Sequence, residues 1–294
     1  MGAGGIGSYL GARLAHAGAD VTLICRGRHL AALRERGLRF QSPASEFTVG
    51  KIAASDDPAT VGAADLVIEA VKLYDLAEST RAMLPLLGPR TLVVTVQNGV
   101  TAADEVAAIA GRERVVPGLV FINAHVEAPG LVVSRGRSQT FIVGAHDERI
   151  SGFVERCAAA GIDAHVSPDI RADLWRKFMP VAALSALACL CRQPIGPILA
   201  DAGLKKVYRQ AMEEVAALAR AKEIGLEADI VERMLALAAT YQYDARVSML
   251  EDLEAGKRLE LEWLSGYVSR EAARHGVPVP FHDIAYACLL PLAK

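Results

Sequence analysis

The 294-residue sequence has little of what several classes of protein require. Its formal net charge is only −2, and no long run of Lys or Arg interrupts it, which argues against nucleic acid and anionic membranes as partners. Its five cysteines are odd in number, scattered, and without metal-ligand spacing. This pattern predicts neither a disulfide framework nor a zinc or redox centre, and it fits a reducing cytoplasm.

Long apolar runs are also lacking, and no signal peptide is recognisable before the first glycines. The longest apolar run, Phe178–Cys191, is interrupted by Pro180 and Ser185, and is too short to span a bilayer. It is typical of a buried helix. The seven histidines show no H-x-x-x-H spacing and no triad-like cluster, so we expect no metal site. We expect a cytoplasmic protein without a membrane anchor.

A glycine-rich stretch at the start of the chain carries the first positive signal. Gly2, Gly4 and Gly7 fit G-x-G-x-x-G and lead into a predicted helix over Ser8–His16, which a predicted strand over Asp20–Cys25 follows. In dinucleotide-binding folds these glycines allow a tight turn, a close approach to the pyrophosphate, and helix–strand packing. The backbone N–H groups of such a turn bind the diphosphate. The predicted cofactor-binding loop is Gly2, Gly4, Gly5, Ile6 and Gly7.

The strand that should precede these glycines is missing, because only Met1 stands before them. A dinucleotide-binding fold needs about four to six more apolar residues there. We expect Met1 to be the last residue of that first strand, with the natural start lying upstream.

Arg26 follows the predicted strand at a position where NAD-preferring proteins present an acidic side chain to the ribose. A guanidinium at this position suits the 2′-phosphate of NADP, through charge-assisted hydrogen bonds. The alternative is a solvated basic turn. Arg26 therefore favours NADP over NAD.

Two further predicted strands end in polar residues. The strand over Ala64–Val71 is followed by Lys72, and the strand over Thr91–Val96 by Gln97, Asn98 and Gly99. Ligands lie at the carboxyl ends of strands in open α/β sheets, so Lys72 and Asn98 are candidates to contact nicotinamide or substrate. Asn98-Gly99 is alternatively an ordinary turn dipeptide.

The remaining pattern predicts two domains. Three short strands are expected at Val115–Ile122, Gly130–Ser134 and Thr140–Val143, then a helix over Asp147–Gly161 and a strand over Asp163–Val166. Beyond this the chain reads as helical, with prolines 194, 197, 278 and 280 marking breaks. We predict a Rossmann-type α/β dinucleotide-binding domain over 1–167, lacking its first strand, and an all-helical substrate and catalytic domain over 168–294. The helices that we expect in the second domain are Asp169–Cys191, Gly203–Glu223, Glu227–Tyr241, Arg246–Glu254, Arg258–His275 and His282–Leu292.

Two segments in the helical half give the chain a specific resemblance. The first reads Ile170-Arg-Ala-Asp-Leu-Trp-Arg-Lys177, and the second contains Ser248-Met-Leu-Glu-Asp-Leu253 followed by Glu260. With the glycine loop and the polar strand ends, this set resembles the ketopantoate reductase (2-dehydropantoate 2-reductase) family over nearly the whole chain. The resemblance implies NADPH-dependent reduction of a 2-oxo acid to a 2-hydroxy acid.

The resemblance also implies residue roles. Lys177 resembles the catalytic lysine and Glu260 its acidic partner; Asn98 and Ser248 resemble substrate contacts, and Arg26 and Lys72 cofactor contacts. The chemistry of the reaction supports the role of Lys177, because hydride addition to a ketone creates an alkoxide that needs a cation or proton donor. Without the flanking pattern, Lys177 would read as an exposed helix lysine, and Glu251, Glu254 and Glu262 compete with Glu260.

Three positions depart from the family pattern. Where the family has asparagines after the catalytic lysine and before the substrate serine, this chain has Val181, Ser185 and Ala245. Those amides serve the hydroxyl end of ketopantoate, so their loss predicts a more apolar substrate pocket lined by Val181 and Ser185. We expect weak ketopantoate turnover and better activity on a 2-oxo acid with an apolar tail.

Two other functions remain open at this point. A 3-hydroxyacid or imine-type dehydrogenase shares the two-domain plan, although Val181 replaces the asparagine expected there after the lysine. A non-catalytic NADP-binding sensor is the other. The predicted partner is a small-molecule 2-oxo acid; a homodimer is compatible with the sequence, which does not fix the oligomeric state.

Overall fold

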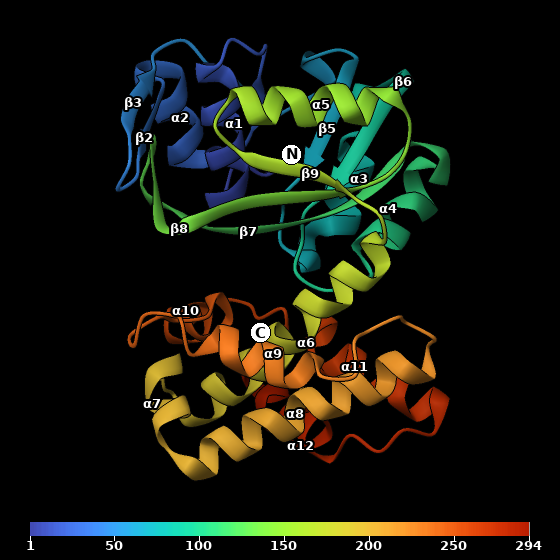
Figure 1. The fold of residues 1–294 in the computed structure, drawn as a ribbon. Helices are drawn as coiled ribbons and strands as arrows, with labels where there is room; N and C mark the ends of the chain where they lie inside the picture. The colour runs from blue at the N-terminus through green and yellow to red at the C-terminus, as the bar shows by residue number, and fades with distance from the viewer. Residues whose placement is uncertain (294) are drawn as a thin grey trace. The chain divides into compact units, whose positions relative to one another are not determined.

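The computed structural model describes residues 1–293, without the side chains of residues 136–138. The chain divides into two compact units. The first contains Met1–Gln97 and Thr101–Ile170, and the second contains Asn98–Val100 and the chain from Arg171 onward. The predicted fold class is confirmed: an α/β unit with a Rossmann-like sheet is followed by a helical unit (Figure 1).

The α/β unit alternates strands with helices. Its helices are α1 (Gly5–His16), α2 (Gly27–Arg36), α3 (Leu76–Ala82), α4 (Ala102–Ala110) and α5 (Glu148–Ala159). Its strands are β1 (Thr22–Ile24), β2 (Leu38–Gln41), β3 (Glu46–Val49), β4 (Ala53–Ser55), β5 (Ala64–Glu69), β6 (Leu87–Thr95), β7 (Val115–Ala128), β8 (Leu131–Gly144) and β9 (Asp163–Ser167). Short 3-10 helices are η1 (Pro58–Thr60), η2 (Leu73–Asp75), η3 (Leu84–Leu86) and η4 (Arg112–Arg114).

The strands form one large sheet and one separate pair. The large sheet runs β3-β2-β8-β7-β6-β5, with β9 paired to β8, and β1 pairs with β4 in parallel. The three short strands predicted between residues 115 and 143 are wrong: this region forms the two long strands β7 and β8, side by side in Figure 1. The polar stretch around Arg135 does not end the ladder, because the register shifts between Ile122 and Asn123 and pairing continues.

Met1 and Gly2 lie between β1 and β5. The Met1 amine donates to the carbonyl of Ile68 at 2.7 Å, and the Met1 carbonyl accepts from the N–H of Ala70 at 2.9 Å. On the other side, the N–H of Gly2 donates to the carbonyl of Ile24 at 3.1 Å. The backbone of Met1 and Gly2 therefore occupies the place that the sequence assigns to the end of a first strand.

Helix α1 packs against the large sheet through a buried aromatic side chain and two hydrogen bonds to Gln139. Tyr9 is fully buried and packs edge-on against Phe40 of β2, with ring centroids 5.6 Å apart. Its hydroxyl donates to Oε1 of Gln139 on β8 at 2.5 Å, and Arg13 donates to the same oxygen at 2.8 Å. A buried phenol needs such a partner, so Gln139 fixes α1 against the β7–β8 hairpin.

The second unit is helical among its described residues. Its helices are α6 (Ile170–Cys191), α7 (Ile195–Ala200), α8 (Ala202–Ala221), α9 (Ile230–Ala238), α10 (Ser248–Glu254), α11 (Ser265–His275) and α12 (Pro280–Leu289), with 3-10 turns η5 (Leu261–Trp263) and η6 (Leu290–Leu292). The sequence reading missed α7 because it took Pro194 and Pro197 as breaks. Pro194 caps this helix and Pro197 lies in its first turn, where no helical N–H bond is needed. Residues 258–264 do not begin a helix as predicted, since η5 precedes α11.

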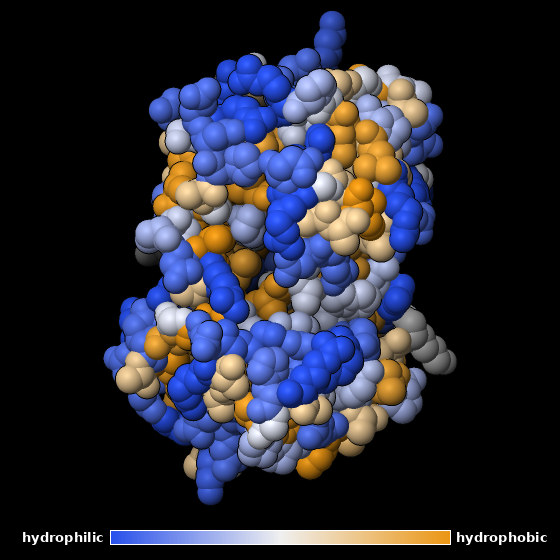
Figure 2. All heavy atoms as spheres, turned by 90° about the vertical axis from the view of Figure 1, so that its right-hand side faces the viewer, coloured by the Kyte–Doolittle hydropathy of each residue, from blue (hydrophilic) through white to orange (hydrophobic). Residues whose placement is uncertain are grey.

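Helix α6 is the central core helix of this unit. It is long and apolar enough to cross a membrane by length and composition alone. Most of its side chains from Trp175 to Cys189 are nevertheless buried, in one cluster with α8, α10 and α11. On the face drawn in Figure 2, by contrast, hydrophilic side chains predominate and apolar ones form small groups between them. The apolar run in α6 therefore serves packing, as the sequence predicts.

Candidate active site

Lys177 lies on α6, one turn before Pro180. The proline has no backbone N–H and cannot donate the helical hydrogen bond to the carbonyl of Arg176, yet α6 continues through it. Trp175 and Phe178 flank Lys177 in sequence; both are buried, and both contact the ring of Tyr267 on α11. Two aromatic anchors thus hold this turn of the helix in place.

The side chain of Lys177 is half-buried. Burial lowers its pKa from 10.5 to about 8, and the negative charge of Glu260 partly opposes that shift. Desolvation disfavours a charge, whereas a nearby opposite charge favours it. At neutral pH the lysine therefore stays charged, yet it can release a proton near the operating pH, as a general acid requires.

Glu260 is 5 % exposed and immediately precedes η5. It is far from Lys177 in the sequence, but the helical unit brings the two charges into electrostatic contact. Of the competing acids, Glu262 is engaged elsewhere, because it pairs with Arg270 and accepts a hydrogen bond from Tyr286 at 2.6 Å. Glu254 pairs with Arg246. Glu260 is the acidic residue that acts on Lys177.

The predicted substrate contacts share a unit with Lys177. Val181 and Ser185 follow it by one and two turns on α6; Val181 is half-buried and Ser185 is buried. Ser248 is exposed at the first residue of α10. Asn98 also belongs to the helical unit, as part of the segment Asn98–Val100, although the chain on both sides of this segment, up to Gln97 and from Thr101, belongs to the α/β unit.

The glycine loop has the shape that a phosphate-binding turn requires. Gly4 is the N-cap of α1, no side chain caps this end, and the first turn holds no acidic residue. A Cβ at Gly5 would lie 2.0 Å from the carbonyl oxygen of Ala124, and one at Gly7 2.2 Å from that of Gly2. A Cβ at Gly4 would meet nothing within 4 Å. Packing therefore demands glycine at positions 5 and 7, whereas at Gly4 open space lies over the helix N-terminus, which fits a bound pyrophosphate.

Arg26 and Lys72 follow strands of the α/β unit. Arg26 is the N-cap residue of α2, two residues after the end of β1, and its guanidinium is largely exposed with Glu78 3.6 Å away. Such a surface pair is weak, so Arg26 can turn to a phosphate. Lys72 is half-buried and stands three residues after β5, as the N-cap of η2.

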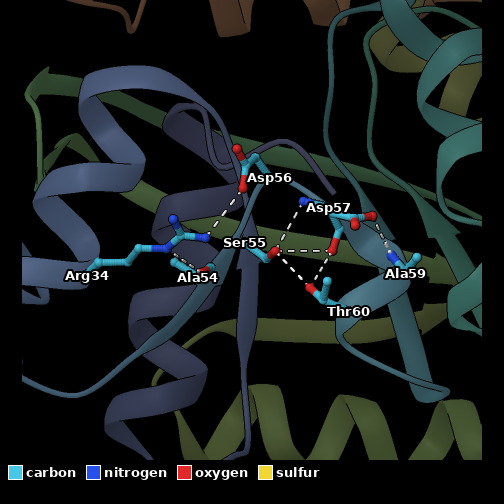
Figure 3. Close-up of polar contacts among 7 residues, drawn as sticks. All are labelled: Arg34, Ala54, Ser55, Asp56, Asp57, Ala59 and Thr60. Carbon is cyan, nitrogen blue, oxygen red and sulfur yellow. Dashed lines mark hydrogen bonds and ion pairs between the residues drawn. The ribbon is translucent and has the colours of Figure 1, made fainter.

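The sequence reading missed a polar turn that follows β4, between residues 55 and 60. Ser55 bonds the Thr60 hydroxyl at 3.0 Å and donates to the Asp57 carbonyl at 3.1 Å (Figure 3). Arg34 of α2 donates to Asp56 at 3.3 Å and to the carbonyl of Ala54 at 3.2 Å. Because β4 is parallel to β1, this turn lies at the same carboxyl edge as Arg26. No local motif marks it, since β4 is only three residues long.

Comparison with known proteins decides the family. The family model described as ketopantoate reductase PanE/ApbA matches residues 1–148, and the model of its C-terminal part matches residues 169–293. The chain belongs to the ketopantoate reductase family. The 2-dehydropantoate 2-reductase of Mesorhizobium japonicum is 30% identical over 318 residues, covering 100% of this chain and 96% of that protein.

Solved structures agree with this assignment. The PanE/ApbA family ketopantoate reductase from Ralstonia eutropha JMP134 is 32% identical, with a TM-score of 0.93 over 100% of this chain and 97% of that one. A D-mandelate dehydrogenase solved with NADH and anilino(oxo)acetate is 20% identical, with a TM-score of 0.90 over 99% of this chain and 96% of that one, and shares the fold. 

Membership confirms the predicted class of enzyme and its cofactor. Ketopantoate reductases are NADPH-dependent oxidoreductases that act on CH–OH groups. The open glycine loop and the basic residue after β1 fit that cofactor. Among residues 1–293, no group of three or more His, Cys, Asp or Glu side chains is arranged to hold a metal ion.

Proposed function

We propose that this ketopantoate reductase family member reduces a 2-oxo acid to a 2-hydroxy acid with NADPH, and prefers 2-oxo acids with an apolar tail over ketopantoate. The observation that carries the proposal is the half-buried Lys177, whose charge interacts with that of Glu260, on the same helix as Val181 and Ser185. The substrate is a small molecule. The five cysteines are free, which is consistent with a reducing cytoplasm.

Lys177 supplies the acid for this reaction. When bound, NADPH would supply the hydride for the carbonyl carbon, with the C=O π electrons passing to the carbonyl oxygen. Lys177 donates a proton to the oxygen that becomes the hydroxyl, and solvent then restores the proton to the lysine. Before that step, its positive charge stabilises the developing alkoxide, and Glu260 keeps the ammonium charged until the proton is needed.

The proposed preference for an apolar tail rests on three side chains. Val181, Ser185 and Ala245 offer less hydrogen bonding than the asparagines that the family has there, and Val181 and Ala245 both pack against the apolar core. A substrate hydroxyl buried without a partner costs about 1–3 kcal/mol. The D-mandelate dehydrogenase that binds anilino(oxo)acetate supports the idea that this fold accommodates a bulky apolar tail.

The test is NADPH oxidation at 340 nm with ketopantoate, pyruvate, 2-oxobutyrate, 2-oxoisovalerate and an aromatic 2-oxo acid. We expect the highest kcat/KM for one of the apolar-tailed acids and its loss in Lys177→Ala. Lys205→Ala, a change of another lysine of the helical unit, is the matched control. Ketopantoate as clearly the best substrate would refute the pocket argument while leaving the reaction class intact.

A non-catalytic NADP-binding sensor is the remaining alternative. It would bind NADPH with normal affinity, but no 2-oxo acid in the panel would drive its oxidation. The shifted pKa of Lys177 disfavours this reading, because perturbed values are enriched at catalytic sites.

A further inference from the structure

His29 connects three separate parts of the α/β unit. It lies in the first turn of α2, three residues after Arg26. Its Nε2 is 3.3 Å from the hydroxyl of Ser8 on α1, and its Nδ1 is 3.1 Å from the backbone nitrogen of Gly130. Gly130 belongs to the turn between β7 and β8.

The directions of these hydrogen bonds follow from their chemistry. Ser8 is fully buried and donates its single hydroxyl proton to the carbonyl of Ala3 at 2.9 Å, so it can only accept from His29. The N–H of Gly130 can only donate, so Nδ1 of His29 must be the acceptor. His29 is therefore neutral, with its proton on Nε2. Burial lowers the pKa of His29, which also favours the neutral form.

The resulting relay runs from Gly130 through His29 and Ser8 to Ala3. Ala3 lies inside the glycine loop, between Gly2 and Gly4. The relay thus fixes the loop that faces a pyrophosphate relative to the α2 turn that presents Arg26. Both ends of the relay are backbone groups, so its length is set by the fold rather than by flexible side chains.

We propose that His29 is a positioning residue for the dinucleotide, setting the distance between the glycine loop and the Arg26 turn and thereby favouring cofactors with a 2′-phosphate. NADP binds at both places, whereas NAD binds the glycine loop but has no 2′-phosphate for Arg26. Loss of the relay should therefore weaken NADP⁺ more than NAD⁺. The proposal rests on the cofactor of the family and is independent of the 2-oxo acid that the enzyme reduces.

The variants His29→Asn and Ser8→Ala test the relay from its two sides. Asparagine keeps an acceptor near Gly130 but loses the donor to Ser8, and Ser8→Ala removes the next bond. We expect each to raise the Kd for NADP⁺ about three- to tenfold by calorimetry, with the Kd for NAD⁺ changing less than twofold. The double variant should be no worse than either single one, because both interrupt the same relay.

Further measurements separate positioning from a general loss of structure. His165→Asn, a change of an exposed histidine on β9, is the control and should leave both Kd values unchanged. In steady state, His29→Asn should raise the KM for NADPH while kcat stays within twofold. His29→Gln, which retains a donor toward Ser8, should recover part of the NADP⁺ affinity and serves if His29→Asn folds poorly. Equal weakening of both dinucleotides, or additive effects in the double variant, would overturn the proposal.

Discussion

Ser265 and His282 form a hydrogen bond in the interior of the helical unit, with 3.1 Å between Oγ and Nδ1 and neither side chain exposed. The other ring nitrogen, Nε2, donates to the carbonyl of Ala211 at 3.1 Å. The imidazole therefore joins α11 and α12 to α8 in its neutral form. Its burial lowers the pKa from 6.5 to about 4.

This relationship predicts acid destabilisation of the helical unit. Between pH 6.5 and about 4 the unfolded chain binds a proton at His282 that the folded chain does not, so stability falls as pH falls through this window. At the lower end of this window, near pH 4, the free energy of unfolding should be smaller by about 3 kcal/mol than above pH 6.5. Urea unfolding followed by the fluorescence of Trp175 and Trp263, both in this unit, measures it. His282→Gln should be less stable at pH 7 but should lose this part of the pH dependence; an unchanged slope would contradict the assignment.

The reaction should fail on the alkaline side as Lys177 loses its proton. With a pKa of about 8, kcat/KM for reduction should fall about tenfold for each pH unit above that value. Glu260→Gln removes the charge that raises this pKa, so the alkaline limb should move to lower pH. Lys177→Ala should reduce kcat/KM by about 10²–10⁴-fold. Profiles of initial rate against pH from 6 to 10 measure both effects. If the alkaline fall in kcat/KM occurs at the same pH in Glu260→Gln as in the wild type, Glu260 does not raise the pKa of Lys177.

Restoring amides in the substrate pocket should restore ketopantoate turnover. The variant Val181→Asn/Ser185→Asn/Ala245→Asn offers partners for the substrate hydroxyl, and kcat/KM for ketopantoate should rise about 5- to 150-fold. The same variant should lose activity on apolar-tailed acids, and the ratio of the two kcat/KM values is the measurement. Leu237→Asn, at an exposed apolar position of α9, is the matched control. A parallel change for all substrates would argue against a specificity role.

Gly4 and Gly5 should respond differently to alanine. Gly4 has φ −75°, which alanine adopts readily, and its Cβ would meet no protein atom. Gly4→Ala should therefore fold normally, yet weaken NADP⁺ binding tenfold or more, because the methyl group enters the pyrophosphate space. Gly5→Ala would collide with the carbonyl of Ala124 and should lower Tm. Thermal unfolding without ligand, together with calorimetric Kd values, distinguishes the two. A stable Gly5→Ala would contradict the packing argument.

Local motifs led to the site residues that we predict, and the functional roles of these residues stay predictions. The turn at Gly2–Gly7 and the charged residues Lys177 and Glu260 stand in short patterns whose chemistry is readable from residue type, and the structure places the last two in electrostatic contact. The roles of Asn98 and Ser248 in substrate binding stay predictions. The membership of Asn98 in the helical unit could not be predicted from the sequence, because the segment Asn98–Val100 lies between two long stretches of chain that belong to the α/β unit.

Long-range pairing accounts for what the sequence did not reveal. His29 appeared unremarkable because its partners lie 21 and 101 residues away. The strands β7 and β8 were read as three short pieces because polar residues such as Arg135 interrupt the hydrophobic pattern, although the register shift lets pairing continue. Burial and long-range pairing, rather than local sequence preference, determine both the surroundings of His29 and the extent of strands β7 and β8.

The β7–β8 hairpin also has a consequence for the order of folding. Strand β2 pairs with β8, and Tyr9 is hydrogen-bonded to Gln139, 130 residues away in the sequence. The backbone at Gly5 lies so close to the carbonyl of Ala124 on β7 that no side chain fits between them. During synthesis the first helix therefore emerges long before the strands against which it packs. The glycine loop acquires its final shape late, so dinucleotide binding cannot guide the early steps of folding and stabilises only a unit whose hairpin is already in place.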